Sequence, residues 1–83
     1  MIGKFENLEV RGYEEKVSKI GNRYLIVRAE DETGKLNELM DKNLDRAQYY
    51  KKGTQGDFYL QLTLGRYTNV EIKDFRIHDD SLN

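Results

Sequence analysis

The sequence predicts an all-β domain with one short helix, its elements following the order β-β-β-α-β-β. Two observations carry this prediction. Apolar residues alternate with polar ones from Phe58 to Leu64, and this period of two is typical of a strand with one buried face. Leu44, Ala47 and Tyr50 instead recur at every third position, which indicates an apolar stripe along a short helix. No second stripe of that kind is visible, so we expect one helix among strands.

The first two strands are expected at residues 5–17 and 23–30, on either side of a Gly-Asn turn at 20–23. The first segment alternates in part between apolar and polar residues, and the second is rich in β-branched and aromatic types. The facing of the second strand stays open. Either the row that contains Leu25 or the alternate row that contains Tyr24 points into the core.

A third strand and the helix follow. Residues 31–34, Asp-Glu-Thr-Gly, have the composition of a polar turn. Residues 35–40 fit either a short strand or the start of a helix, and we expect a strand. The helix is predicted over residues 43–52, with Asp41 or Asn43 as its N-cap.

The C-terminal half is expected to form two strands joined by a turn. Residues 54–57 are predicted as a loop, 58–64 and 70–77 as strands, and 65–69 as the turn between them. The apolar residues of the last strand change parity halfway along it. One inserted residue near Lys73–Asp74, a β-bulge, would restore the register.

Five short strands with a helix between the third and fourth are the element order of an OB-fold, a small, partly open Greek-key barrel. A ferredoxin-like fold would need a second helix. An SH3-like barrel also has five strands, but it usually carries only a 3₁₀ turn where this sequence offers about ten helical residues. We therefore predict one OB-like domain over residues 1–78 and a short acidic tail at 79–83.

Length and composition exclude several classes of protein. The chain has 83 residues, a net charge of −1 and no Cys, so neither a disulfide framework nor a thiolate metal site is available. The longest apolar run, from Leu25 to Val27, is far shorter than the roughly 18 residues of a membrane span. The N-terminus lacks the apolar stretch of a signal peptide. We expect a cytoplasmic protein with no membrane partner.

The near-zero net charge is an average over segments of opposite sign. Residues 1–28 sum to +2 and residues 46–76 to +3, whereas residues 29–45 sum to −4 and residues 77–83 to −2. Non-specific binding of nucleic acid is largely electrostatic, so the net charge opposes it while the two basic segments favour it.

No catalytic, cofactor or metal constellation is visible. The only His is His78, and neither Ser18 nor Ser81 lies in a nucleophile turn. The segment Gly53–Gly56 lacks the Lys-Ser/Thr pair of a phosphate-binding loop. Adjacent carboxylates such as Glu14–Glu15 fit a solvated surface better than acid–base or metal chemistry. We expect a protein that is not an enzyme and has no cofactor, metal or small-molecule substrate.

Tyrosines interleaved with Lys and Arg are the more informative pattern, because basic groups hold the phosphates of single-stranded nucleic acid while bases stack on aromatic rings. Tyr13 and Tyr24 are expected beside arginines on the first two strands. Tyr59 should point away from the apolar row of its strand, and Tyr67 falls in a turn that OB-folds use for ligands. Each ring could instead pack against a neighbouring strand. The predicted nucleic-acid-binding residues are Arg11, Tyr13, Arg23, Tyr24, Arg28, Tyr59, Arg66, Tyr67 and Lys73.

Two stretches resemble small OB-fold single-stranded-DNA-binding proteins of phages and bacterial mobile elements. Residues 25–34, LIVRAEDETG, are similar to the second strand of such proteins and its acidic, glycine-containing turn. Residues 52–60, KGTQGDFYL, are similar to the beginning of their fourth strand. The chain differs from the bacterial housekeeping single-strand-binding family in having no Trp and only a short tail at 79–83.

We therefore expect binding of single-stranded DNA with little sequence preference, by tyrosine stacking and Lys/Arg phosphate contacts, in the replication, recombination or transfer of DNA. RNA could occupy the same surface, since stacking on aromatic rings serves both. A homo-oligomer would raise the affinity through avidity. The alternative is an adaptor or accessory module with an OB-like barrel that binds a protein of a phage or mobile-element complex, which the acidic stretch 30–45 favours.

Overall fold

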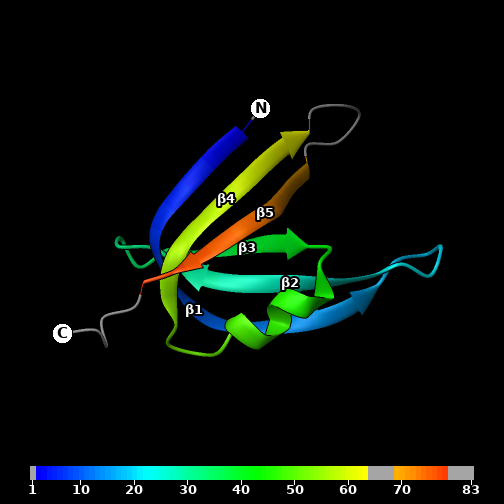
Figure 1. Cartoon of the computed structure of the whole chain (residues 1–83), viewed down its shortest axis with the longest axis horizontal. Helices are drawn as coiled ribbons and strands as arrows, with labels where there is room; N and C mark the ends of the chain where they lie inside the picture. The colour runs from blue at the N-terminus through cyan, green and yellow to red at the C-terminus, as the bar shows by residue number, and fades with distance from the viewer. Residues whose placement is uncertain (1, 64–68, 79–83) are drawn as a thin grey trace.

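The computed structural model describes residues 2–63 and 69–78, and these form strands and one short helix (Figure 1). The strands are β1 (Ile2–Val17), β2 (Arg23–Glu30), β3 (Leu36–Asp41), β4 (Gln55–Thr63) and β5 (Asn69–Ile77). The helix η1 (Leu44–Tyr49) lies between β3 and β4. The mostly-β class and the order of the elements are therefore as the sequence predicts. Residues 64, 79–83 and most of the predicted turn at 65–69 lie outside the described part of the chain.

The five strands pair in a ring, in the order β1-β2-β3-β5-β4, with β4 returning to β1. All neighbours are antiparallel except β3 and β5, which are parallel. The β3–β5 contact is also the shortest, because only Met40 and Glu71 are aligned there. The ring is thus held by long antiparallel ladders on four sides and by a narrow seam on the fifth.

Two bulges let β1 take part in both halves of the ring. Its N-terminal part pairs with β4 and its C-terminal part with β2, so the strand curves strongly along its length (Figure 1). The first bulge falls between Phe5 and Leu8, where Asn7 has a positive φ of 59°. The second falls between Val10 and Gly12, where Arg11 is the extra residue. Bulges bend a strand and increase its twist, so these two residues account for the curvature.

The core lies inside the ring, and alternate residues of the strands contribute their side chains to it. Leu25, Val27 and Ala29 are buried, which places the alternate row of β2, beginning at Tyr24, on the outer face. The rings of Tyr50, Phe58 and Phe75 cluster at the centre, with centroids 4.5 to 6.1 Å apart. Such distances suit aromatic packing, and all three rings belong to the buried core.

The helix is shorter and tighter than predicted. The sequence suggested a helix over residues 43–52, whereas η1 is a 3₁₀ helix of six residues, Leu44–Tyr49, with Asn43 as N-cap. The physical reason is the spacing of the apolar stripe, since a 3₁₀ helix has three residues per turn and aligns positions i and i+3. Tyr50 is buried, and both Leu44 and Ala47 pack against the core. The predicted stripe is therefore correct, but helix length no longer separates an OB-fold from an SH3-like barrel.

The last two strands confirm one local prediction and overturn another. Along β5, Asp74 is opposite Tyr59 and Ile72 is opposite Leu60, so Lys73 is the inserted residue of the predicted bulge. The predicted loop at 54–57 is wrong from Gln55 onward, because β4 begins there. Gly56 lies within β4. An added Cβ atom there would come within 2.3 Å of the Arg76 carbonyl oxygen, so glycine at this position allows two strands to approach closely and does not form a turn.

Candidate nucleic-acid interface

The outer face of β2 carries two of the predicted binding residues, Tyr24 and Arg28, with Ile26 between them. All three are half-buried, and the residues that alternate with them point into the core. On β3 the residue opposite Ile26 is Met40. Tyr24, Ile26 and Met40 therefore form an apolar strip on the outside of the ring.

Tyr13 and Arg23 lie on the other side of the sheet. The bulge at Arg11 changes the parity of β1, so Tyr13 is opposite Val27, whose side chain is buried. Directly opposed residues in an antiparallel pair share a face, so Tyr13 lies on the face of Val27, where it is 44% exposed. Arg23 belongs to the same row as Val27 by the alternation of β2. Tyr13 and Arg23 thus belong to the row that alternates with that of Tyr24, although Arg23, at the start of β2, lines a hollow together with Tyr24.

Tyr59 occupies a third surface. It is half-buried on the outside of β4, as the alternation predicts, and it is opposite Lys4 on β1. The Lys4 ammonium lies 5.3 Å from the centroid of the Tyr59 ring, and the Arg76 guanidinium lies 5.6 Å from it. Both distances suit cation–π contacts. Two cations of this chain therefore contact the ring of Tyr59.

The remaining predicted residues add little to a common surface. Arg66 and Tyr67 lie outside the described residues. Lys73 is the exposed bulge residue of β5, and its carbonyl oxygen accepts a hydrogen bond from Arg46. Its ammonium contacts Glu71. The described members of the predicted set are therefore distributed over several faces of the ring.

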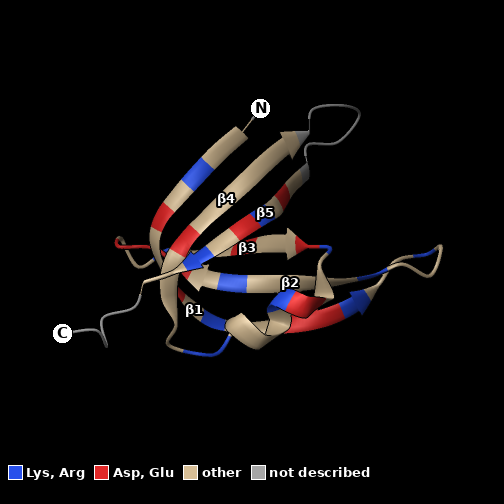
Figure 2. Ribbon diagram, in the orientation of Figure 1, with Lys and Arg blue, Asp and Glu red and all other residues tan. Residues whose placement is uncertain are grey.

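Carboxylates neutralise most of the predicted cations. Lys and Arg alternate with Asp and Glu over the strands, without a broad basic face in the view of Figure 2. Ion pairs at the surface contribute little to stability, but they compensate the charge that a phosphate would meet. The nitrogen–oxygen distances are 2.9 and 3.8 Å from Arg11 to Glu9 and Glu30, 2.7 Å from Arg23 to Glu15, 3.6 Å from Arg28 to both Glu14 and Glu38, and 3.2 Å from Lys73 to Glu71.

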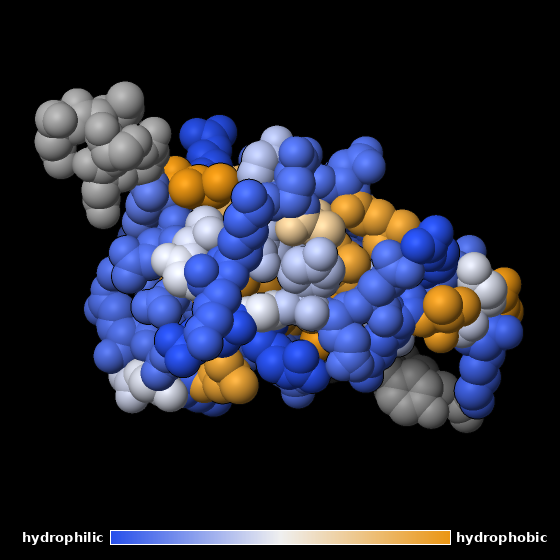
Figure 3. Space-filling view, turned by 90° about the horizontal axis from the view of Figure 1, so that it is seen from below, coloured by the Kyte–Doolittle hydropathy of each residue, from blue (hydrophilic) through white to orange (hydrophobic). Residues whose placement is uncertain are grey.

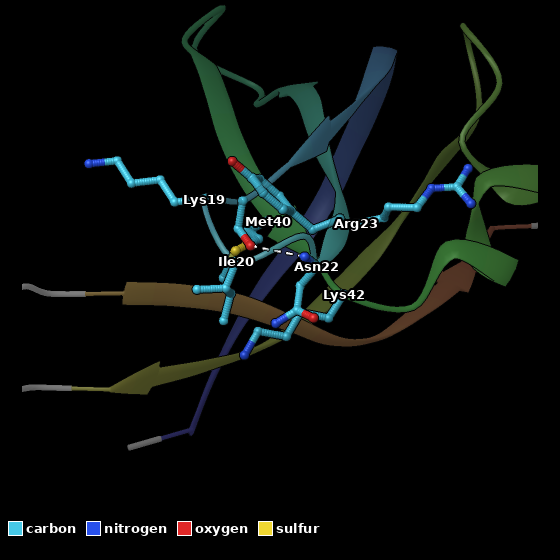
Figure 4. Close-up of a pocket in the computed structure, with 8 residues that line it drawn as sticks. Lys19, Ile20, Asn22, Arg23, Met40 and Lys42 are labelled. Atoms are coloured by element: carbon cyan, nitrogen blue, oxygen red, sulfur yellow. Dashed lines mark hydrogen bonds between the residues drawn. The ribbon is translucent and has the colours of Figure 1, made fainter.

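A hollow of about 670 Å³ lies where the β1–β2 hairpin meets β3 (Figure 4). Sites for small ligands commonly have volumes of about 300–1,000 Å³, so this hollow is large enough for a nucleobase and its sugar. Two predicted binding residues, Arg23 and Tyr24, line it. Its other lining residues are not among the predicted binding residues: Ser18, Lys19, Ile20, Asn22, Met40 and Lys42.

The hairpin turn is fixed by its own hydrogen bonds. The Ser18 amide donates to the Asn22 carbonyl oxygen at 2.8 Å, and the Asn22 amide donates to the Ser18 hydroxyl oxygen at 3.1 Å. Gly21 has a φ of 90°, a left-handed conformation that glycine adopts without strain. This turn leaves Ile20 83% exposed at the rim of the hollow. Figure 3 shows hydrophobic residues at this end of the molecule.

The hollow combines a tyrosine with cationic side chains. In Figure 4, Lys19 and Arg23 extend in opposite directions from it. No Asp or Glu is among its lining residues, and within the described chain Lys19 makes no ion pair. The Lys42 ammonium lies 3.5 Å from Glu71. A further lysine, Lys16, is directly opposite Tyr24 on β1.

This arrangement can hold a flat ring against Tyr24 and an anion beside it. Tyr24 is half-buried and the apolar strip continues from it, so a base would leave water on stacking there. Lys16, Lys19 and Lys42 are flexible donors around the ring and could each reach a phosphate. The pattern that could have identified them is the hairpin itself, since pairing across a turn at 18–22 places residues 16 and 24 opposite each other.

Comparisons with known proteins give no relative: no protein-family model, no curated protein and no solved structure matches the chain. Within residues 2–63 and 69–78, no group of three or more His, Cys, Asp or Glu side chains is arranged to hold a metal ion. The same residues contain no helix that is long and apolar enough to cross a membrane.

Proposed function

We propose that the ring is an OB-fold and that the protein binds single-stranded DNA without catalysing a reaction. The strand order supports the OB assignment, because β1 pairs with both β2 and β4, and the helix lies between β3 and β4. The single aligned residue pair between β3 and β5 fits the partly open barrel of that fold. OB-folds bind oligonucleotides on the face of their second and third strands and on the adjoining loops.

The observation that carries the function is the hollow on that face. Tyr24 supplies a stacking surface, Lys19 and Lys42 line the same hollow, and Lys16 is opposite Tyr24 on β1. Stacking of a base on an aromatic side chain contributes about 1–3 kcal/mol and does not depend on base identity. We therefore infer little sequence preference. The cellular setting that fits such an activity is the replication, recombination or transfer of DNA, as in phages and mobile elements.

The test is a titration of fluorescently labelled oligo-dT, followed by anisotropy at about 50 mM salt. We expect Tyr24→Ala to weaken binding at least fivefold, because about 1–3 kcal/mol of stacking is lost. Tyr49→Ala is the matched control, since Tyr49 is 44% exposed on η1, away from the hollow, and should leave affinity unchanged. Absence of binding at about 300 μM protein, or equal effects of the two variants, would contradict the proposal.

A protein-interaction module remains the second candidate, favoured by the many ion pairs that neutralise the outer faces. An adaptor would not bind oligo-dT in the titration above, and it would co-purify with a protein partner. Oligo-rU in place of oligo-dT tests RNA in the same assay, since the stacking chemistry is shared.

A further inference from the structure

One edge of β1 has no partner strand among the described residues. Between Ile2 and Phe5, β1 pairs with β4 on one side, and pairing with β2 begins only at Glu9. Among the described residues no strand pairs with the other edge of residues 2–6, which therefore presents backbone donors and acceptors. At Asn7 the edge ends, because its amide donates to Asp57 and its side chain donates to Glu32 of the β2–β3 turn. Such an edge is a template for pairing with a further strand.

Apolar side chains accompany this free edge. Ile2 is 84% exposed, and Phe5 is 43% exposed although its partner Phe58 is fully buried. Ile2 and Phe5 border a groove of about 180 Å³ that is otherwise lined by Gly3, Leu60, Leu62 and Val70. The open edge and an apolar surface thus lie at the same end of the ring, near the N-terminus in Figure 1.

We propose that two copies of this chain associate through this edge, with residues 4–6 of each β1 pairing antiparallel about Phe5. The charges of the strand favour a second copy as the occupant. With Phe5 opposite Phe5 of the second copy, Lys4 is opposite Glu6 of that copy and Glu6 is opposite its Lys4. Within one chain the Lys4 ammonium already lies 3.4 Å from a Glu6 carboxylate oxygen. The two-fold axis therefore joins two such pairs into a cluster of alternating charge, and opposite charges across adjacent antiparallel strands are stabilising.

Other nearby registers lack this complementarity. Pairing centred on Lys4 would place two Lys4 side chains opposite each other, and pairing centred on Glu6 would do the same with two carboxylates. Like charges directly opposite each other destabilise a strand pair. The positive φ of Asn7 interrupts the extended backbone at the bulge, so the paired segment is short. Interfaces below about 1,200 Å² are typical of weak association, and we expect a dimer that forms in the micromolar range.

The test uses two charge-reversal variants, Lys4→Glu and Glu6→Lys, and measures mass by sedimentation velocity without nucleic acid. Each variant alone places like charges opposite each other and should weaken self-association at least tenfold. When the two variants are mixed, carboxylates of one chain face ammonium groups of the other, and a heterodimer should form with about the wild-type affinity. A circular-dichroism spectrum equal to the wild-type spectrum shows that each variant is folded.

A second measurement exploits the absence of cysteine. The chain has no Cys, so Phe5→Cys introduces a single thiol that would lie opposite its own copy. Oxidation should cross-link this variant into dimers, whereas Lys35→Cys, in the β2–β3 turn, should stay monomeric under the same conditions. A monomeric wild type at about 500 μM, a mixture of charge variants that does not associate, or equal cross-linking of both cysteine variants would each overturn the proposal.

Discussion

Asp41 is the one buried charged residue among the described residues, and three groups satisfy its carboxylate. The Tyr50 hydroxyl donates to Oδ2 at 2.5 Å, and Arg46 and the Asn43 amide donate to Oδ1 at 2.8 and 2.9 Å. Burial, together with this carboxylate, raises the pKa of Tyr50 above its ordinary value. The network ties η1 to the end of β3, because a buried charge is costly unless it is fully hydrogen-bonded.

We expect Tyr50→Phe to lower the free energy of unfolding by about 1.5–3 kcal/mol, since Oδ2 of Asp41 would lose its donor in the core. Urea denaturation measures this change. Tyr49→Phe is the control: Tyr49 is 44% exposed, and its hydroxyl makes no hydrogen bond within the described residues. A Tyr50→Phe variant as stable as the control would contradict this role of Asp41.

At the scale of the elements, the alternation of apolar and polar residues along a strand predicted the course of the backbone better than composition did. The change of parity between Ile72 and Phe75 predicted the β5 bulge, because both side chains had to reach one core. The bulge at Arg11 has no such signal, since it is followed by Gly12 and by an exposed tyrosine. Tyr13 consequently lies on the same face as Val27. Parity reveals a bulge only where apolar residues on both sides of it are buried.

A carboxylate joins three strands at the first bulge of β1 and should make stability depend on pH. Asp57 on β4 accepts a hydrogen bond from the Asn7 amide at 2.9 Å and contacts His78, just beyond β5, at 2.8 Å. The Asn7 amide first, and His78 second, lower the pKa of the Asp57 carboxyl. A group whose pKa is lower in the folded than in the unfolded state stabilises the fold at pH values above its unfolded-state pKa. This stabilisation is lost as the pH falls through its folded-state pKa.

We therefore expect the free energy of unfolding to be largest above about pH 4 and to decrease as the pH falls through the folded pKa of Asp57. In Asp57→Asn this decrease should be smaller. Urea denaturation between about pH 6 and pH 2.5 measures it. Asp45→Asn is the control, because the Asp45 side chain makes no ion pair among residues 2–63 and 69–78. Equal pH profiles for the Asp57→Asn variant and the wild type would show that this junction contributes nothing.

At the scale of the whole molecule, the net charge of −1 hides how the charges are paired. Three of the arginines predicted to bind phosphate, Arg11, Arg23 and Arg28, lie beside carboxylates. Of the lysines near Tyr24, only Lys42 has an ion pair among the described residues. Composition located Tyr24 beside basic residues. It did not identify Lys16, Lys19 and Lys42, because they become neighbours only through the hairpin and the β2–β3 pairing.

The proposed site makes about three phosphate contacts, so the logarithm of the binding constant should fall with the logarithm of the salt concentration with a slope of about −2. Removing one of the three lysines near Tyr24 (Lys16, Lys19 and Lys42), for example by Lys19→Ala, should make that slope shallower by about 0.7. Lys35→Ala is the control because Lys35 is exposed and does not line the hollow. Anisotropy titrations at several salt concentrations measure the slopes, and equal slopes for both variants would exclude Lys19 from the interface.

The most direct test of the central claim is to titrate oligo-dT into the ¹⁵N-labelled protein and to measure which backbone amide chemical shifts change. If the hollow holds the nucleic acid, the largest changes fall on residues 18–24 of the hairpin and on residues 40–42 at the end of β3. The amides of Tyr59 and its neighbours on β4 should then change little. Shifts concentrated on β4 around Tyr59, or no shifts at saturating oligonucleotide, would contradict the account.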